Sequence, residues 1–236
     1  MERRDNVQRE PGKVSIVITN YNRAAYLIEC LDSLKKQTHA DTEIIFVDDA
    51  STDRSVDVVQ AWCEENGLAG TDAFVLVRLP RNVGFSGAMT TGLFLARGEY
   101  IAVQDADDFS HWKRLEKQIS FLQSHPDIAL VGTSYAAFVN TEQRVYEEAK
   151  WLRYGEEIRK VYQNGGHCVC HGTIMFRGDA FDRIGGLSRR IVGAEDYEFI
   201  VKFLHQKERI ENIPEILYYY RLHADQRSLA YYAKKE

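Results

Sequence analysis

The sequence predicts an α/β fold in which a mostly parallel sheet is covered by helices on both faces. Short runs of β-branched residues alternate in the first half with segments whose apolar residues recur at helical spacing, and capping residues or glycine separate them. Such alternation implies right-handed crossovers between parallel strands. With 236 residues, 44% hydrophobic and 28% charged, the chain is long enough to bury a sizeable core.

The elements of the first half follow in order. Four strands are expected where Val, Ile and Phe gather, at residues 14–19, 44–47, 74–79 and 100–104. The first predicted helix has one apolar face, formed by Leu27, Ile28, Leu31 and Leu34.

Two more helices complete the alternation of the first half. The second helix is expected to begin after a capping residue and to end at Gly67, with three of its side chains packed against the core. The candidate caps are Ser51, Thr52 and Asp53, and the inward residues are Val56, Val59 and Cys63. The third helix runs from about Ser86 to Arg97, with Gly98 expected at the C′ position.

The regular alternation ends in the second half. A helix from about Trp112 to Ser124 stops before Pro126, and residues 128–131 resemble a strand. Past Tyr135 only a helix near residues 196–205 and a strand near residues 209–213 are clear. Because there is no internal repeat, linker or firm boundary, we expect a single domain, residues 1–236.

Charge and hydropathy exclude several functional classes. Thirty Lys and Arg against 35 Asp and Glu give a net charge of −5 and leave no broad basic surface for nucleic acid. No apolar run reaches the roughly 18 residues of a membrane-spanning helix, and the first residues lack the apolar core of a signal peptide. We expect a cytoplasmic protein, whose tail at residues 231–236 is a candidate for peripheral contact with the inner face of a membrane. The sequence does not indicate an oligomeric state.

The four cysteines, Cys30, Cys63, Cys168 and Cys170, are too few for a disulfide framework in a chain of this length, so we expect reduced thiols. The run from His167 to His171 contains two histidines and two cysteines, which are ligands that zinc prefers. In a strand, however, the histidines and the cysteines would face opposite sides and could not converge. Buried thiols beside a cleft are the favoured interpretation, and zinc is the alternative.

Polar residues follow three predicted strands, at the edge where an open parallel sheet binds ligands. They are residues 19–22, 48–53 and 105–108. The third group places Asp105, Asp107 and Asp108 together, where mutual repulsion would raise their pKa values unless a cation lay among them. Mg²⁺ or Mn²⁺, which prefer oxygen ligands, would satisfy this group.

Other motifs fit the aspartate-rich segment less well. Such a loop can be a solvated turn that caps the next helix. An EF-hand is excluded by Phe109 and Ser110, which replace a ligand and the turn glycine. There is no Walker phosphate loop, and Gly84, Gly87 and Gly92 are too widely spaced for a dinucleotide fingerprint.

Five segments in order resemble the nucleotide-sugar-dependent glycosyltransferases of family 2, which share the GT-A fold. The likeness extends from about Lys13 to Ser228 and is carried by VSIVITNYNR (14–23), EIIFVDDASTD (43–53), GEYIAVQDADD (98–108), GAEDYEF (193–199) and YYRLH (219–223). Each segment alone is weakly specific, and the five together are strong. The resemblance implies a Rossmann-like nucleotide-sugar-binding half, about residues 13–108, and an acceptor-binding half, about residues 109–228.

The resemblance also implies the roles of individual residues. Thr19 and Asp49 would contact the nucleotide base, and Asp105 would hold the ribose or the sugar. Asp107 would bind the metal that bridges the diphosphate, and His223 resembles a position near the metal. Asp196 would be the general base, with Glu195 as the second choice. The other donor-binding positions would be Asn20, Tyr21, Asn82, Gly87 and Ala106.

The activity that this resemblance implies is inverting sugar transfer from a nucleoside-diphosphate donor, with a UDP-sugar favoured, to a hydroxyl of a saccharide or lipid-linked glycan. A divalent ion, Mn²⁺ or Mg²⁺, would stabilise the departing phosphate. Asp196 would take the proton of the acceptor hydroxyl if partial burial raises its pKa toward neutrality. The Gln-x-x-Arg-Trp motif of processive synthases is missing, which favours one sugar per encounter.

The sequence departs from the family pattern at Thr19, where many relatives have proline, and at Met89 and Thr90, where Arg-Asn is usual. Two other functions stay open. Haloacid dehalogenase-like phosphatases also place Asp-X-Asp after a strand, although Phe109 does not suit their motif. A catalytically silent sugar-nucleotide-binding protein would have the same fold.

Overall fold

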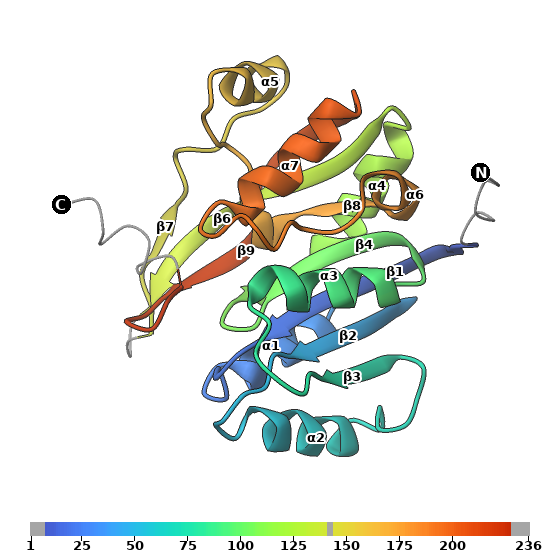
Figure 1. Ribbon diagram of the computed structural model, residues 1–236, viewed down its shortest axis with the longest axis vertical. Helices are drawn as coiled ribbons and strands as arrows, with labels where there is room; N and C mark the ends of the chain where they lie inside the picture. Colours follow the sequence, from blue (N-terminus) through green and yellow to red (C-terminus); the bar gives the residue numbers. More distant parts are fainter. Residues whose placement is uncertain (1–7, 141–143, 228–236) are drawn as a thin grey trace.

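The computed structural model describes residues 8–140 and 144–227, so the predicted membrane contact at residues 231–236 lies outside the described part. Figure 1 shows one twisted sheet that runs through the described chain. Four strands of the first half pair in parallel in the order β3-β2-β1-β4, as the alternation predicts. They are β1 (Glu10–Asn20), β2 (Thr42–Asp48), β3 (Phe74–Arg78) and β4 (Gly98–Asp105).

The sheet continues without a break into the second half. Strand β8 (Met175–Arg177) joins β4 and β6 (Ile128–Val139) antiparallel to both, and β9 (Arg209–Leu222) pairs in parallel with β6. The short strands β5 (Phe109–Ser110) and β7 (Tyr146–Glu148) pair antiparallel with β9 and β6. Strand β9 therefore brings the end of the described chain back to the residues that follow β4.

Helices cover both faces of the sheet, as expected. On one face α1 (Leu27–Lys35), α2 (Ser55–Glu65) and α4 (Arg114–Ser124) pack against the core that contains Ile16 and Ile18 of β1. On the other face α3 (Phe85–Leu95), α6 (Gly178–Ile184) and α7 (Glu195–His205) pack against Val17 of the same strand. The alternation of side chains along β1 thus supplies both cores. The remaining α-helix of the described residues, α5 (Glu156–Gln163), adds Ile158 and Tyr162 to the core that contains Val17.

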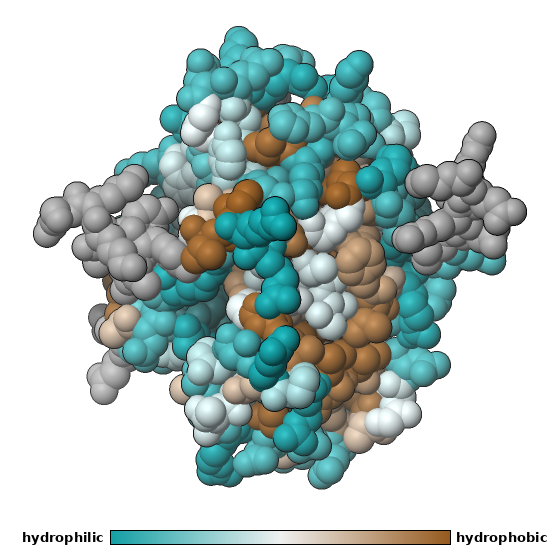
Figure 2. All heavy atoms as spheres, in the orientation of Figure 1, coloured by the Kyte–Doolittle hydropathy of each residue, from teal (hydrophilic) through white to brown (hydrophobic). Residues whose placement is uncertain are grey.

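Helix α3 carries apolar residues on its outer side as well as on its buried side. Its buried residues include Met89 and Leu93, whereas the Phe94 side chain is 67% exposed and Leu95 is also exposed. Figure 2 shows the resulting hydrophobic surface over this helix. Within the described residues no helix is both long enough and apolar enough to span a membrane.

Three local predictions for the first half need correction. Gly98 is not a helix C′ residue, because α3 ends at Leu95 and Gly98 is the first residue of β4. A Cβ at Gly98 would lie 2.6 Å from the backbone oxygen of Lys13, so the glycine allows β4 to approach β1. Val56 is only half-buried. Arg54 directly precedes α2, although Asp53 accepts a hydrogen bond from the Ser55 N–H at 2.9 Å.

The second half contains more regular structure than its sequence indicates. Strands β6 and β9 extend well beyond residues 131 and 213, and β7, β8, α5 and α6 were not predicted. The run from His167 to His171 is not a strand, because it consists of irregular backbone that enters the 3₁₀ turn η1 (His171–Thr173). The argument against a zinc site assumed that residues 167–171 form a strand, and that assumption was wrong. The four cysteines are free, and Cys30, Cys63 and Cys168 are buried.

Candidate active site

The carboxyl ends of β1, β2 and β4 open into a cavity of about 1040 Å³, whose far wall comes from the second half. The topology brings these strand ends together because parallel neighbours end at one edge of the sheet. Of the residues that the resemblance singles out, ten line this cavity: Thr19, Asn20, Tyr21, Asp49, Asn82, Asp105, Ala106, Asp107, Glu195 and Asp196. Gly87 and His223 do not line it, although His223 contacts the lining residue Asp107.

Asp49, at the tip of β2, is held by the loop that leads into α3. Its two carboxylate oxygens accept hydrogen bonds from the backbone N–H groups of Val83, at 2.7 Å, and Gly84, at 2.9 Å. Burial raises the pKa of Asp49, and these two hydrogen bonds oppose that increase. The neighbouring Asn82 donates to the Asp49 carbonyl oxygen at 3.2 Å. The cavity therefore contains a fixed carboxylate that keeps free lone pairs for a further donor.

The three aspartates at the end of β4, which are expected from the sequence to lie around one cation, have different protein partners. Asp105 is close to the Tyr218 hydroxyl, at 3.4 Å, and burial together with Asp107 raises its pKa. Asp108 is buried, and its Oδ1 accepts a hydrogen bond from the Arg221 N–H at 2.7 Å. Burial, and after it repulsion from the neighbouring aspartates, raises the pKa of both Asp105 and Asp108, as the sequence predicts for carboxylates this close together.

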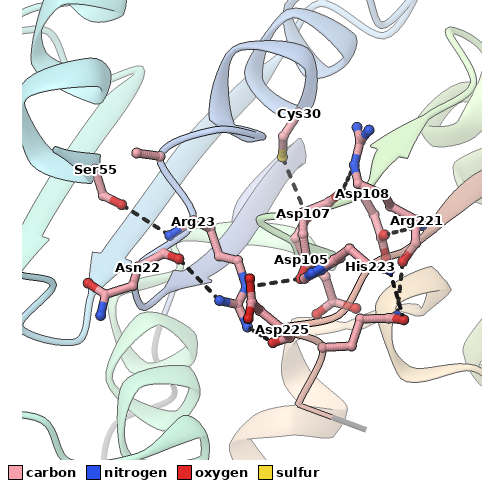
Figure 3. Close-up of polar contacts among 12 residues, drawn as sticks. Asn22, Arg23, Cys30, Ser55, Asp105, Asp107, Asp108, Arg221, His223 and Asp225 are labelled. Atoms are coloured by element: carbon pink, nitrogen blue, oxygen red, sulfur yellow. Dashed lines mark hydrogen bonds and ion pairs between the residues drawn. The ribbon is translucent and has the colours of Figure 1, made fainter. Parts of the chain in front are cut away.

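Asp107 is the aspartate that is best placed to bind a metal (Figure 3). Its Oδ2 lies 3.0 Å from Nε2 of His223 and 3.2 Å from Nε of Arg23. Burial alone would raise the pKa of Asp107, but the His223 hydrogen bond and the Arg23 charge outweigh it and lower the pKa. The side chain is thus an ionised carboxylate that lies beside an imidazole nitrogen.

The donor set fits a divalent ion that is bound together with a diphosphate. Among the described residues no group of three or more His, Cys, Asp or Glu side chains is arranged to hold a metal. Asp107 and His223 offer one oxygen and one nitrogen, whereas Mg²⁺ requires about six ligands and keeps waters or substrate phosphates among them. An ion held by these two residues would therefore need its other ligands from the substrate and from water.

Glu195 and Asp196 lie across the cavity at the first turn of α7. Glu195 is buried, and it accepts hydrogen bonds from the Gly193 N–H at 2.9 Å and from Arg227. The Asp196 side chain is 43% exposed, and its Oδ2 lies 3.4 Å from Nε2 of His167. Asp196 is therefore more accessible to an acceptor than Glu195.

The protonation of Asp196 differs from the prediction. Burial raises its pKa, but the contact with His167 and the nearby charges outweigh burial and lower the pKa to about 2. The role of general base is expected from the sequence on the condition that burial raises this pKa toward neutrality, and the structure does not meet that condition because His167, a partner that the sequence does not indicate, lowers it.

Comparison with known proteins identifies the family. A family model described as Glycosyl transferase family 2 matches residues 15–185. The chain belongs to glycosyltransferase family 2. It is 31% identical over 219 residues to the putative glycosyltransferase EpsE of Bacillus subtilis, which covers 90% of this chain and 74% of EpsE. The amylovoran biosynthesis glycosyltransferase AmsE of Erwinia amylovora is 28% identical, over 89% of this chain and 77% of AmsE.

Two solved structures support the GT-A fold of this glycosyltransferase. The S. aureus TarS 1–349 structure in complex with UDP-GlcNAc superposes with a TM-score of 0.73 at 22% identity, over 92% of this chain and 60% of TarS 1–349. The mannosyltransferase PcManGT of Pyrobaculum calidifontis, in complex with GDP-Man and Mn²⁺, gives a TM-score of 0.71 at 20% identity, over 92% of this chain and 59% of PcManGT. This chain thus spans about three-fifths of the length of these two structures.

Several cavity residues of the glycosyltransferase were missed by sequence reasoning. The missed residues that line the cavity are Arg23, Tyr135, Arg189 and Arg227, together with His167, which was considered only as a metal ligand. The cavity is also lined by Trp151 and Tyr220, two aromatic residues that the sequence offers for stacking on a saccharide. Arg23 belongs to the first family-like segment and could have been included on that basis. Most of the others lie in the second half, where no periodicity indicates their position.

The unusual pair Met89-Thr90 is turned away from the cavity. Met89 is buried in the core, and the Thr90 hydroxyl accepts a hydrogen bond from the Leu187 N–H at 2.9 Å. Arg189, two residues after Leu187, lines the cavity instead. A cation is therefore present on this side of the site although α3 does not provide one.

Proposed function

We propose that this glycosyltransferase transfers a sugar, with inversion, from a nucleoside-diphosphate donor to a hydroxyl of a saccharide or of a lipid-linked glycan. The observation that carries the proposal is the composition of one cavity. Asp49 and Asp107 lie at the strand ends that form one wall, and Asp196 lies on α7 across from them. Candidate groups for the base, the diphosphate and the acceptor proton therefore face the same space.

The proposed donor is a UDP-sugar. The fixed Asp49 carboxylate is suited to accept a hydrogen bond from the imide N–H of uracil, because it lines the cavity and has lone pairs beyond the two that accept from Val83 and Gly84. Three arginines on the cavity wall, Arg23, Arg189 and Arg227, offer cationic donors for a diphosphate. TarS, a structural neighbour, has been solved with UDP and with UDP-GlcNAc, although PcManGT has been solved with GDP-Man.

Asp107 and His223 would hold a divalent ion, Mn²⁺ or Mg²⁺, against the diphosphate. Such an ion, when bound, acts as a Lewis acid that stabilises charge on the departing phosphate. In the same step Asp196 takes the proton of the acceptor hydroxyl, whose oxygen forms the bond to the anomeric carbon. The bond from that carbon to the phosphate oxygen breaks, and the nucleoside diphosphate leaves. Because attack and departure occur on opposite faces of the sugar, the anomeric configuration inverts.

An aromatic wall next to Asp196 supports a saccharide acceptor. Trp151 and Tyr135 both line the cavity, and the Trp151 Nε1–H donates to the Tyr135 hydroxyl at 2.8 Å. This bond fixes the indole, which is 37% exposed and therefore offers a face to a ligand. Tyr220 extends the wall, with its ring centroid 5.5 Å from that of Tyr135. Rigid amphipathic rings of this kind provide apolar contact area together with hydrogen-bonding groups, as recognition of a sugar ring requires.

The test is a screen of UDP-, GDP- and dTDP-sugars with Mn²⁺, in which donor hydrolysis and transfer to saccharide acceptors are measured. Wild type should turn over at least one UDP-sugar, and EDTA should abolish the reaction. Asp107→Ala should lower kcat/KM about 100-fold or more, because it removes a charged ligand of the proposed ion. The matched control is Asp57→Ala, an exposed aspartate on α2.

Two outcomes would contradict the proposal. Binding of a sugar nucleotide without any product, over a broad set of acceptors and with water, would identify a catalytically silent binding protein. Turnover that is unchanged in Asp107→Ala would overturn the assignment of the metal ligand.

A further inference from the structure

His167 has no assigned role, yet it contacts both Trp151 of the aromatic wall and Asp196, the proposed base. It lies in the irregular segment between α5 and η1. Its Nδ1 is 2.7 Å from the Tyr162 hydroxyl of α5, and its Nε2 is 3.4 Å from Oδ2 of Asp196 on α7. A single ring thus bridges a buried phenol and the carboxylate that is to accept a proton.

The chemistry of the two partners fixes the tautomer of a neutral His167. An ionised carboxylate has no proton to donate, so a hydrogen bond with Asp196 requires that Nε2 of His167 carry the proton. The Nδ1 atom of the neutral ring is then an acceptor, and the Tyr162 hydroxyl donates to it. The buried Tyr162 hydroxyl, whose pKa burial raises above its ordinary range, remains protonated and supplies this hydrogen bond.

Packing fixes the orientation of the His167 ring. The Tyr162 ring meets it edge-on, with an interplanar angle of 89° and 5.6 Å between centroids. Tyr197 meets it at 61°, and Trp151 covers it at 30° with 5.4 Å between centroids. Three aromatic rings therefore contact the imidazole, and they restrict the orientations in which its Nε2 can face away from Asp196.

We propose that His167 is a positioning residue for sugar transfer: Tyr162 holds its tautomer, and its Nε2–H keeps the Asp196 carboxylate ionised and oriented toward the acceptor. This inference rests on the proposed function, because it needs Asp196 to be the base. Trp151 packs on the same ring, so an acceptor that contacts Trp151 would also lie beside the carboxylate.

The pH dependence of the reaction should report this role. Asp196 is also affected by His171 of η1 and accepts a hydrogen bond from the Tyr197 N–H at 2.8 Å, while Cys170 and Tyr162 are neutral at pH 7. The adjacent Glu195 is paired with Arg227. Burial of Asp196 raises its pKa and the His167 contact lowers it. Removal of His167 therefore leaves burial less opposed, and the pKa of Asp196 rises.

The experiment compares His167→Ala and His167→Gln with wild type over pH 4–9, with kcat and donor KM for transfer measured at each pH. The Gln variant keeps a neutral N–H donor near the position of Nε2. We expect His167→Ala to lower kcat by about 10- to 100-fold at pH 7 with donor KM unchanged, as for a group whose loss misplaces a catalytic side chain. The acidic limb of its kcat profile should move to higher pH. His167→Gln should recover at least about a third of the wild-type kcat.

Two further variants complete the test. Tyr162→Phe removes the hydroxyl that fixes the tautomer of His167, and it should lower kcat less than His167→Ala does. The acidic limb of its kcat profile should also move to higher pH. His205→Gln, at the far end of α7, is exposed and should match wild type. Thermal unfolding and UDP binding in the presence of Mn²⁺ show whether each variant is folded and binds its donor.

The inference fails if His167→Ala has wild-type kcat and an unmoved acidic limb, or if its loss lies entirely in donor KM. If His167→Ala does not fold, His167→Gln and Tyr162→Phe decide the question by the same criteria. An Asp196→Asn variant that transfers sugar as well as wild type would instead show that Asp196 is not the general base, which would contradict the proposed function itself. The two failures are therefore distinguishable.

Discussion

His171 shows how a single buried ring in the cavity wall makes stability depend on pH. It packs edge-on against Phe85 and Phe199, and burial lowers its pKa to about 4. In the unfolded chain a histidine titrates near 6.5, so between these two pH values the unfolded state binds more protons. Folding stability should therefore fall as the pH drops through this interval, by about 3 kcal/mol for a shift of this size.

Urea unfolding at pH 7 and at pH 4.5 measures this effect. His171→Asn cannot titrate, so it should lose about 2–3 kcal/mol less than wild type over the same interval. His205→Asn, an exposed histidine, should behave as wild type does. Equal losses in wild type and His171→Asn would show that His171 is not the group that titrates.

Ala50, directly after Asp49, has a left-handed backbone with φ of +59°. This conformation costs about 1–2 kcal/mol for a residue with a Cβ, whereas glycine adopts it freely. The greater freedom of glycine in the unfolded chain offsets about 0.4–1 kcal/mol of the relief. Ala50→Gly should therefore raise the free energy of unfolding by about 0.5–1 kcal/mol, as measured by urea denaturation. A loss of stability would show that Ala50 is not strained.

Most of the candidate donor-site residues that sequence reasoning found lie at or just after the ends of strands, whereas Glu195 and Asp196 lie in the first turn of α7 and were found through the family resemblance. Thr19, Asp49 and Asp105 occupy strand ends, and the topology of a parallel sheet places such ends at one edge. Arg189 and Trp151 lie in loops, whose backbone path depends on packing that no periodicity encodes. His167 was considered only as a metal ligand in a strand, so its contact with Asp196 could not be anticipated.

At the scale of elements, Gly98 controls how closely β4 approaches β1. A Cβ there would lie 2.6 Å from the Lys13 oxygen and 2.8 Å from the Ser15 nitrogen, both of them backbone atoms that cannot rotate away. Gly98→Ala should therefore lower the free energy of unfolding by about 1–3 kcal/mol. In the control Gly87→Ala the obstacle is the Val83 side chain, which can move, and alanine favours the helix by about 1 kcal/mol. Equal losses in the two variants, measured by urea denaturation, would contradict this account.

The strands of the second half were underestimated because their pattern is not simple. Strands β6 and β9 pair in parallel along most of their length, but the register shifts around Ser134. Buried polar residues interrupt the apolar runs: Thr133 lies in β6, and Asn212 in β9 donates hydrogen bonds to the carbonyls of Arg153 and Cys168. Helical and strand periods predict elements with one apolar face, and these two strands depend instead on hydrogen bonds that only the folded chain provides.

At the scale of the whole molecule, the end of β9 folds back onto the first half beside the proposed metal ligands. The Arg221 Nε donates to the Asp107 carbonyl at 2.7 Å, and Arg23 donates to the Asp225 carbonyl at 2.7 Å. His223 reaches Asp107 from the same segment. A ligand that binds between these residues would therefore stabilise contacts between both halves of the chain.

This arrangement predicts that metal and nucleotide stabilise the protein only together. Asp107 and His223 are too few to bind Mn²⁺ tightly alone, and UDP without a cation would place its diphosphate beside the Asp107 carboxylate. At a concentration 100 times its Kd, a ligand adds about 2.7 kcal/mol, which corresponds to a rise in Tm of about 5–10 °C for a chain of this size. Thermal unfolding with Mn²⁺, with UDP and with both should show this rise for the pair, little change for either alone, and none for the pair in Asp107→Ala. A full shift with UDP alone would mean that the arginines hold the diphosphate without a metal, and Asp107 would then lose its proposed role.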